Sequence, residues 1–311
     1  MTRTLDTRTL VVRKPVSRRA QAWRETAFGY GMIALSVAAV AVFTAAPIVA
    51  SFALAFFRWD AISPPQFVGL ANFRAMAVDH TITHSLAVTA LIAALIVALQ
   101  VAVGLGLATL VAQRVSRVTR AAFRTAFFLP TLASAASISI VMSYLFDDHF
   151  GVINYYLNHV GLPSVPWLSS TGGATATIVL VAVWQQLGFT FILFVAALTA
   201  LPTDVLEAAT MDGASPVRTF LRVKLPLISP TILFATVVGL INAMQLFDQP
   251  YVMTKGGPGE STRTVVLLIY QTAFQNLQFG YASAMSVLLF VILGLVTAVQ
   301  FWISRRWVFY A

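Results

Sequence analysis

The residues of this chain best placed to do chemistry are polar side chains inside or beside long apolar stretches. The group consists of Trp184, Gln185, Gln186, Asn242, Gln245 and Asp248. Asn242 and Gln245 are three residues apart, which places them on one face of a helix. Amides donate and accept hydrogen bonds, and an aromatic ring covers the apolar face of a sugar. The set is therefore suited to a hydroxyl-rich solute, with hydrogen bonding between helices as the alternative for each residue alone.

Other residue types give no sign of catalysis. The chain has no cysteine, which excludes disulfides, thiolate metal sites and a cysteine nucleophile. It has no GxxxxGK[ST] phosphate loop, and its four histidines lack the spacing of metal ligands. The pair Asp147-Asp148 comes nearest to a reactive cluster, but a solvated helix end explains it better. We therefore predict no catalytic residue, no metal site and no cofactor bound by this chain.

The elements that position the polar group are long apolar stretches. The chain of 311 residues is 59% hydrophobic and 10% charged, whereas soluble domains contain about 25% charged residues. About 20 apolar residues cross a bilayer as a helix. Six stretches qualify: Phe28–Phe57, Ser85–Ala112, Phe123–Phe146, Thr175–Ala200, Thr231–Phe247 and Tyr281–Ile303. They are almost free of charge, with Arg124 at the edge of the third. We predict an all-α polytopic membrane protein with six transmembrane helices.

The distribution of basic residues predicts the orientation. The N-terminal tail, the loops after the second and fourth stretches and the C-terminus hold 16 of the 20 Lys and Arg residues. Basic residues mark the cytoplasmic side, so both termini are expected in the cytoplasm. We divide the chain into a basic cytoplasmic tail, residues 1–27, and a six-helix domain, residues 28–311. A cleaved signal peptide is the alternative for the first stretch, but apolar sequence continues well beyond the usual length.

The cytoplasmic loop over residues 201–230 has the local signals of two short helices. Thr203 or Asp204 is expected to cap the first, and Gly213 suits the position after its end, where a positive φ is common. Ser215-Pro216 then begins a second helix, and Leu225-Pro226 ends it. The second helix has an apolar stripe, which must pack on this chain or on a partner.

The same loop carries a specific motif. Its residues are Glu207, Ala208, Ala209, Asp212, Gly213, Ala214, Leu225 and Pro226. The spacing EAAxxDGA…LP, before the penultimate apolar stretch, resembles the EAA loop of binding-protein-dependent ABC importer permeases. The outer segments Phe67–Phe73, Gly151–Asn154 and Phe247–Pro258 resemble those of carbohydrate-importer permeases, including the maltose and glycerol-3-phosphate types. The resemblance covers the chain from about Phe28 to its end and leaves the basic tail unmatched.

This resemblance implies a type I ABC importer permease fold in the cell membrane and a transport subunit rather than an enzyme. The solute would be a carbohydrate or a glycerophosphate-like molecule. The implied partners are a second homologous permease, two cytoplasmic ATPase subunits that bind ATP and magnesium, an external binding protein or lipoprotein, and membrane lipid, but no nucleic acid. The EAA loop would seat in the ATPase as a coupling helix. An ion-coupled secondary transporter and a polytopic membrane enzyme are the alternatives.

Overall fold

The computed structural model describes residues 18–112 and 117–309, and it separates into two compact units, residues 1–53 and 54–311. The first unit is helical. It contains α1 (Arg18–Val40) and most of α2 (Ala46–Leu54), joined through the π-helical turn η1 (Ala41–Ala45). The 30 residues of Glu25–Leu54 are long and apolar enough to cross a membrane. The predicted tail over residues 1–27 lies largely outside the described residues.

The second unit begins with a small hairpin. Strands β1 (Phe57–Arg58) and β2 (Gln66–Phe67) pair antiparallel, and α3 (Ala71–Val78) follows. The Asn72 side-chain amide donates hydrogen bonds to the backbone oxygens of Ala55, at 2.8 Å, and Phe57, at 2.9 Å. The side chain therefore fixes α3 to the start of the hairpin.

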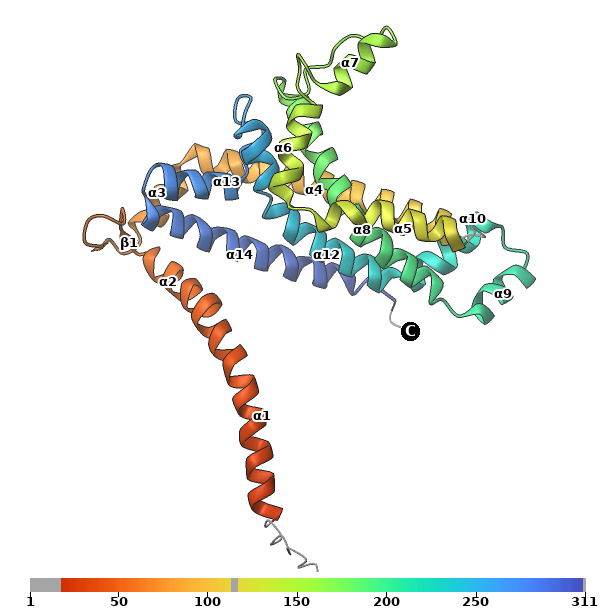
Figure 1. Ribbon diagram of the computed structural model, residues 1–311, viewed down its shortest axis with the longest axis horizontal. Helices are drawn as coiled ribbons and strands as arrows, with labels where there is room; N and C mark the ends of the chain where they lie inside the picture. The colour runs from red at the N-terminus through yellow and green to blue at the C-terminus, as the bar shows by residue number, and fades with distance from the viewer. Residues whose placement is uncertain (1–17, 113–116, 310–311) are drawn as a thin grey trace, which may run out of the picture. The chain divides into compact units, whose positions relative to one another are not determined.

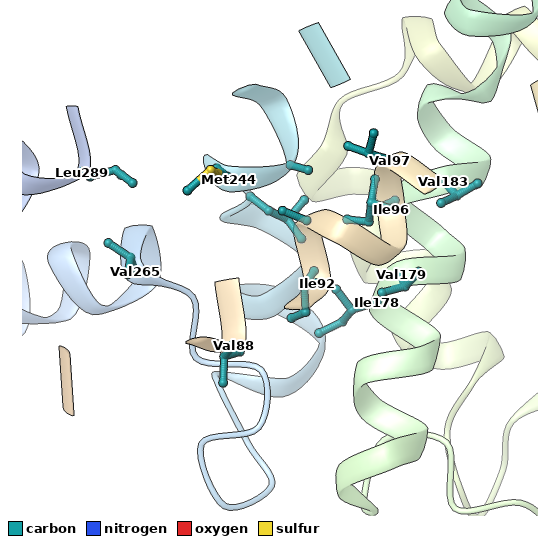
Figure 2. Packing of buried hydrophobic residues seen from close by; sticks show 14 residues of the cluster. Val88, Ile92, Ile96, Val97, Ile178, Val179, Val183, Met244, Val265 and Leu289 are labelled. Atoms are coloured by element: carbon teal, nitrogen blue, oxygen red, sulfur yellow. The ribbon is translucent and has the colours of Figure 1, made fainter. Parts of the chain in front are cut away.

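Four helices form the centre of this unit: α4 (His80–Ala112), α8 (Thr171–Thr199), α12 (Ser229–Met244) and α14 (Phe279–Ser304) (Figure 1). Figure 2 shows the main core, where buried β-branched side chains of α4 and α8 face each other. Its labelled members are Val88, Ile92, Ile96, Val97, Ile178, Val179, Val183, Met244, Val265 and Leu289. This core packs α4 against α8, the helix that contains Gln185 and Gln186.

The third predicted stretch is not one straight helix. It forms α5 (Arg117–Leu132) and α6 (Ala135–Leu145), which meet at an angle of 108°. The helix α5 ends two residues after Pro130, whose carbonyl oxygen accepts from the Ala133 N–H at 3.2 Å. Ser134 then leaves the helical conformation with ψ 132°. A short helix, α7 (Val152–His159), completes this part of the chain.

The loop after α8 contains α9 (Thr203–Met211), α10 (Pro216–Thr219), the π-helical turn η2 (Phe220–Lys224) and α11 (Leu225–Leu227). Residues Pro216–Leu227 run as one bent helix that meets α12 at 66°. The chain then passes through η3 (Pro250–Thr254), α13 (Val265–Tyr270) and η4 (Gln271–Gln275). The short apolar helix Val265–Gln275 was not among the six predicted stretches.

The prediction of a helical membrane fold is confirmed, because the described elements are helices apart from two strands of two residues each. Within the described residues, four helices are long and apolar enough to cross a membrane. The number rises to six if each bent pair, α5 with α6 and Pro216–Leu227 with α12, forms one span.

Candidate functional site

Five of the six predicted polar side chains line one cavity of about 280 Å³. They are Gln185, Gln186, Asn242, Gln245 and Asp248. Gln185 and Gln186 come from the middle of α8, whereas the other three come from the end of α12 and the residues after it. The structure therefore brings together side chains about 60 residues apart in the sequence.

Gln185 is committed to holding the helices around this cavity. It is buried, and its Oε1 accepts a hydrogen bond from Gln249 Nε2 at 2.8 Å. Its backbone oxygen accepts from the Thr131 hydroxyl of α5 at 2.9 Å, and its Nε2 lies 3.5 Å from the Ala133 oxygen. Hydrogen bonding between helices, the alternative weighed above, thus describes Gln185 well.

Unlike Gln185, the side-chain amides of Gln186, Asn242 and Gln245 are free to bind a solute. Asn242 and Gln245 are exposed and Gln186 is partly exposed, and no side-chain hydrogen bond ties any of the three to another described residue. Uncommitted amides at the wall of a cavity can donate to and accept from a hydroxyl-bearing molecule. The Asp248 carboxylate, which is partly exposed, adds an acceptor at the same wall.

Trp184 does not line this cavity. Its side chain is 39% exposed, on another face of α8, because successive residues of a helix point about 100° apart. The aromatic residue and the amides that adjoin it in sequence are therefore separated in space.

A second cavity, of about 300 Å³, adjoins the first. The two share Thr131, Gln186 and Asn242, and the second adds Gln100 of α4 and Thr190 of α8. Gln100 was missing from the predicted set, although it is the one side-chain amide in the stretch Ser85–Ala112. The cost of burying an unpaired amide inside a membrane is the signal that would have identified it.

The cytoplasmic loop has the turn that its sequence predicts. Gly213 has φ +72°, its N–H donates to the Thr210 oxygen at 3.0 Å, and the Ala214 N–H donates to the Ala209 oxygen at 3.0 Å. These two bonds form a Schellman motif, which ends α9 and satisfies its last carbonyls. Glycine adopts this backbone without the steric cost of a Cβ.

Ser215 and Pro216 begin the second helix as predicted, and Ser215 Oγ accepts from the Arg218 N–H at 3.4 Å. The predicted cap of the first helix, Thr203 or Asp204, is wrong. Pro202, with ψ 128°, precedes α9 in place of a side-chain cap, so Thr203 is already helical and its hydroxyl bonds Asp204.

The second helix also does not end at Leu225-Pro226 but continues to Leu227. The wider π-helical turn η2 precedes Pro226, where an α-helical turn would press the proline ring against the preceding carbonyl. The helix therefore passes through the proline.

The loop exposes several of the motif residues and four apolar side chains. Glu207, Ala208, Asp212 and Gly213 are exposed, whereas Ala209, Ala214, Leu225 and Pro226 are partly buried. The exposed apolar side chains of the loop are Val205, Met211, Val217 and Leu221, of which Met211 is 87% exposed. Phe220 lies instead on a groove between the loop and the ends of α4 and α8. The apolar stripe predicted for the second helix is thus divided between this groove and open surface.

The loop lies at one end of the second unit, beside the end of the chain (Figure 1). The Phe309 N–H donates to Ser229 Oγ at the start of α12, at 2.9 Å. The basic residues of the loop and of the C-terminus therefore share this end. Among the described residues, no three His, Asp or Glu side chains gather closely enough to hold a metal ion.

Comparison with known proteins relates the chain to one family. Residues 100–308 match the binding-protein-dependent transport system inner membrane component. The probable starch degradation products transport system permease protein AmyD of Thermoanaerobacterium thermosulfurigenes is 30% identical over 291 residues, 94% of this chain and 98% of that protein. The sn-glycerol-3-phosphate transport system permease protein UgpA of Brucella abortus is 34% identical over 91% of this chain and 96% of its own length.

The trehalose/maltose transport system permease protein MalF of Thermococcus litoralis is 32% identical over 91% of this chain and 95% of that protein. Among solved structures, a chain of a bacterial ABC transporter involved in the import of the acidic polysaccharide alginate superposes with a TM-score of 0.80. That match covers 93% of this chain and 99% of the other at 20% identity, which shows a shared fold.

Proposed function

The chain belongs to the family of binding-protein-dependent transport system inner membrane components, and from this premise we propose how it carries its solute. It is an integral membrane permease subunit of an ABC importer for sugars or related solutes, and it is a transport protein rather than an enzyme. The ion-coupled transporter and the membrane enzyme, considered above as alternatives, are set aside. Three points go beyond family membership: the topology, the solute pathway and the coupling to ATP hydrolysis.

The proposed topology has six spans of a type I importer fold, with both termini in the cytoplasm. Each bent helix pair then counts as one span. The sharing of one end of the second unit by the loop over residues 201–230 and the C-terminus supports this arrangement, because both are basic.

The proposed solute pathway runs through the two adjoining cavities. The observation that carries it is the convergence of Gln186, Asn242 and Gln245 on one cavity with their amides uncommitted. Polar groups inside a membrane are costly unless they pair or line a cavity, and these line one. The solute is a carbohydrate or a glycerophosphate-like molecule, the two classes named for the relatives. Trp184 stands apart from this pathway.

The loop over residues 201–230 is proposed to transmit ATP hydrolysis. Its four exposed apolar side chains and the exposed carboxylate of Glu207 would seat on a cytoplasmic ATPase, which would bind ATP and magnesium. The helix Pro216–Leu227 leads directly into α12, the helix of Asn242, so displacement of the loop would move one wall of the pathway. A second permease and an external binding protein would complete the importer.

Extraction of the tagged chain from native membranes in mild detergent tests this assembly. Mass spectrometry should find an ATPase and a second six-span subunit with it, and the purified complex should import maltose, trehalose or sn-glycerol 3-phosphate in proteoliposomes with ATP inside. Recovery of the chain alone, in detergent that preserves a related importer, would contradict the proposed partners. Import of none of the three solutes would contradict the proposed solute class.

A further inference from the structure

Gln100 is a buried amide of α4 whose hydrogen bonding to the described residues is half complete. The side chain is 4% exposed, in the middle of α4. Its Nε2 donates to the Thr190 hydroxyl at 2.7 Å and lies 3.4 Å from the Gln186 backbone oxygen, both on α8. Its Oε1 is buried and accepts no hydrogen bond from any of the residues that the structure describes. A buried acceptor without a donor is destabilising and calls for an explanation.

The contact with the Gln186 backbone oxygen favours one of the two orientations of the amide, whereas the Thr190 hydroxyl could bond either end of it. Rotation of the amide by half a turn would bring Oε1 against the Gln186 carbonyl oxygen, and two acceptors repel each other. The oxygen therefore faces away from α8 and toward α12. There a Cβ on Gly239 would lie 3.4 Å from it, so the absence of a side chain at Gly239 leaves room beside the acceptor.

None of the described residues donates a hydrogen bond to Oε1, and the residues around it line the second cavity. Its lining includes Gln100 and Gly239 together with the apolar side chains of Phe189, Ala235 and Val238. The uncommitted amides of Gln186 and Asn242 line the same cavity. A molecule there would meet two free amides and one free acceptor around an apolar wall. This pattern suits a ring or chain that carries several hydroxyl groups.

We propose, on the basis of the proposed solute pathway, that Gln100 binds the solute directly. Its Oε1 accepts a hydrogen bond from a solute hydroxyl once the solute has passed from the first cavity into the second. Thr190 orients the amide for this contact by accepting from its Nε2. Gln100 therefore selects for solutes with a hydroxyl at the position that reaches it.

The absence of native cysteine allows a direct test. Phe189→Cys places a reporter thiol on the second cavity, where the side chain is 42% exposed. In the reconstituted complex, we measure how fast a methanethiosulfonate ethylammonium reagent labels this thiol at rising concentrations of maltose, trehalose or sn-glycerol 3-phosphate. A solute that reaches the cavity slows the labelling.

Gln100→Met in this background should raise the half-protecting concentration about ten-fold, the effect of one lost hydrogen bond. Thr190→Val keeps Gln100 but frees its orientation, so a smaller shift is expected, and this variant covers the case in which Gln100→Met does not fold. Gln300→Met is the matched control, because Gln300 Oε1 is also buried without a partner but lines neither cavity. It should leave the half-protecting concentration unchanged.

Monodeoxy derivatives of the protecting sugar identify the hydroxyl. One of them should protect about ten-fold more weakly than the parent sugar in the otherwise wild-type chain and equally well in Gln100→Met. Protection that is the same with and without Gln100→Met, or an equal shift in Gln300→Met, would overturn the role of Gln100 and leave the pathway standing. A complex that imports none of the three solutes and shows no protection would refute the pathway together with this inference.

Discussion

At the scale of single residues, the pair Gln185 and Gln249 is the clearest case of a polar contact that holds membrane helices together. Both side chains are buried, and the 2.8 Å bond between them joins α8 to the segment after α12. Gln185→Leu would leave the Gln249 amide buried without its partner. We expect a loss of about 1–3 kcal/mol in the free energy of unfolding, measured as a lower melting temperature of the purified chain in detergent.

The double variant Gln185→Leu/Gln249→Leu provides the control, because it removes both partners. It should be clearly more stable than the sum of the two single variants implies, with a coupling of about 0.5–3 kcal/mol. Additive losses would show that the bond is not a main contributor and that each amide acts through other neighbours.

Asp79, between α3 and α4, gives the chain a stability that depends on pH. Burial raises the pKa of its carboxyl, whereas hydrogen bonds from the Thr81 N–H at 2.8 Å and the Tyr281 hydroxyl at 2.9 Å lower the pKa. The lowering by the hydrogen bonds is the larger effect, so the pKa of Asp79 lies below the ordinary value. A group with a lowered pKa in the folded state stabilises that state above its ordinary pKa, near 4. The contribution is lost as the pH falls through the lowered value.

Tyr281→Phe tests this dependence, since it removes one of the hydrogen bonds to the ionised carboxylate. We expect a lower melting temperature than that of the wild type at about pH 7, and a difference that shrinks as the pH falls below about 4. Asp79→Asn should show the same trend. A difference that stays constant across this range would mean that the tyrosine acts by packing alone.

At the scale of helices, the crossing of α5 over α8 depends on one glycine. A Cβ at Gly188 would overlap the Phe127 carbonyl oxygen and lie 2.7 Å from the Phe128 Cα. Because both of these are backbone atoms, the clash cannot be relieved by a side-chain rotation. Gly188→Ala should cost about 1–3 kcal/mol or more. Thermal unfolding in detergent and the yield from the membrane measure the effect.

Gly106 is the matched control for Gly188, since it is also a helical glycine but has no atom within 4 Å of an added Cβ. Gly106→Ala should leave the melting temperature unchanged or slightly raised, because alanine favours helix more than glycine does. A similar loss in both variants would indicate a general effect of alanine and not the α5–α8 crossing.

The turn at Gly213 tests the coupling role of the loop. Proline cannot adopt φ +72°, and it lacks the N–H that donates to the Thr210 oxygen. Gly213→Pro should insert and purify like the wild type, while solute uptake per ATP hydrolysed falls by about ten-fold. Gly213→Asn, which tolerates the left-handed backbone, should retain most of the uptake. Unchanged solute-stimulated ATP hydrolysis and uptake in Gly213→Pro would refute the coupling role.

The loop also shows which features of a helix can be predicted from sequence. The turn at Gly213 is held by backbone bonds that span three to five positions, and the Ser215 hydroxyl accepts from the backbone N–H three positions later. Local sequence is therefore sufficient to place both residues. The sharp bend between α5 and α6 was missed because hydropathy measures how apolar a stretch is and not its direction. The passage of the helix through Pro226 was missed because it depends on a π-helical turn, which leaves no mark in composition.

At the scale of the whole molecule, the same distinction holds for the candidate pathway. The rule that polar residues in a membrane are costly selected six side chains, and five of them line one cavity. It could not tell Gln185, which bonds Gln249 across 64 positions of sequence, from Gln186, which stays free. That distinction needs the packing of helices that are distant in sequence. Trp184 shows the same limit, because neighbours in sequence point to different faces of one helix.

The topology is the last property that belongs to the whole chain, and the lack of cysteine makes it measurable. Six spans with both termini inside place the β1–β2 loop and the segment after α7 outside, and the loop over residues 201–230 inside. A membrane-impermeant maleimide should therefore label Ser63→Cys and Ser164→Cys in intact cells. Thr210→Cys and Thr2→Cys should react only after permeabilisation. Inverted vesicles should show the opposite pattern. Labelling of Thr2→Cys in intact cells would mean an odd number of spans, and the helix Glu25–Leu54 would be the first to reconsider.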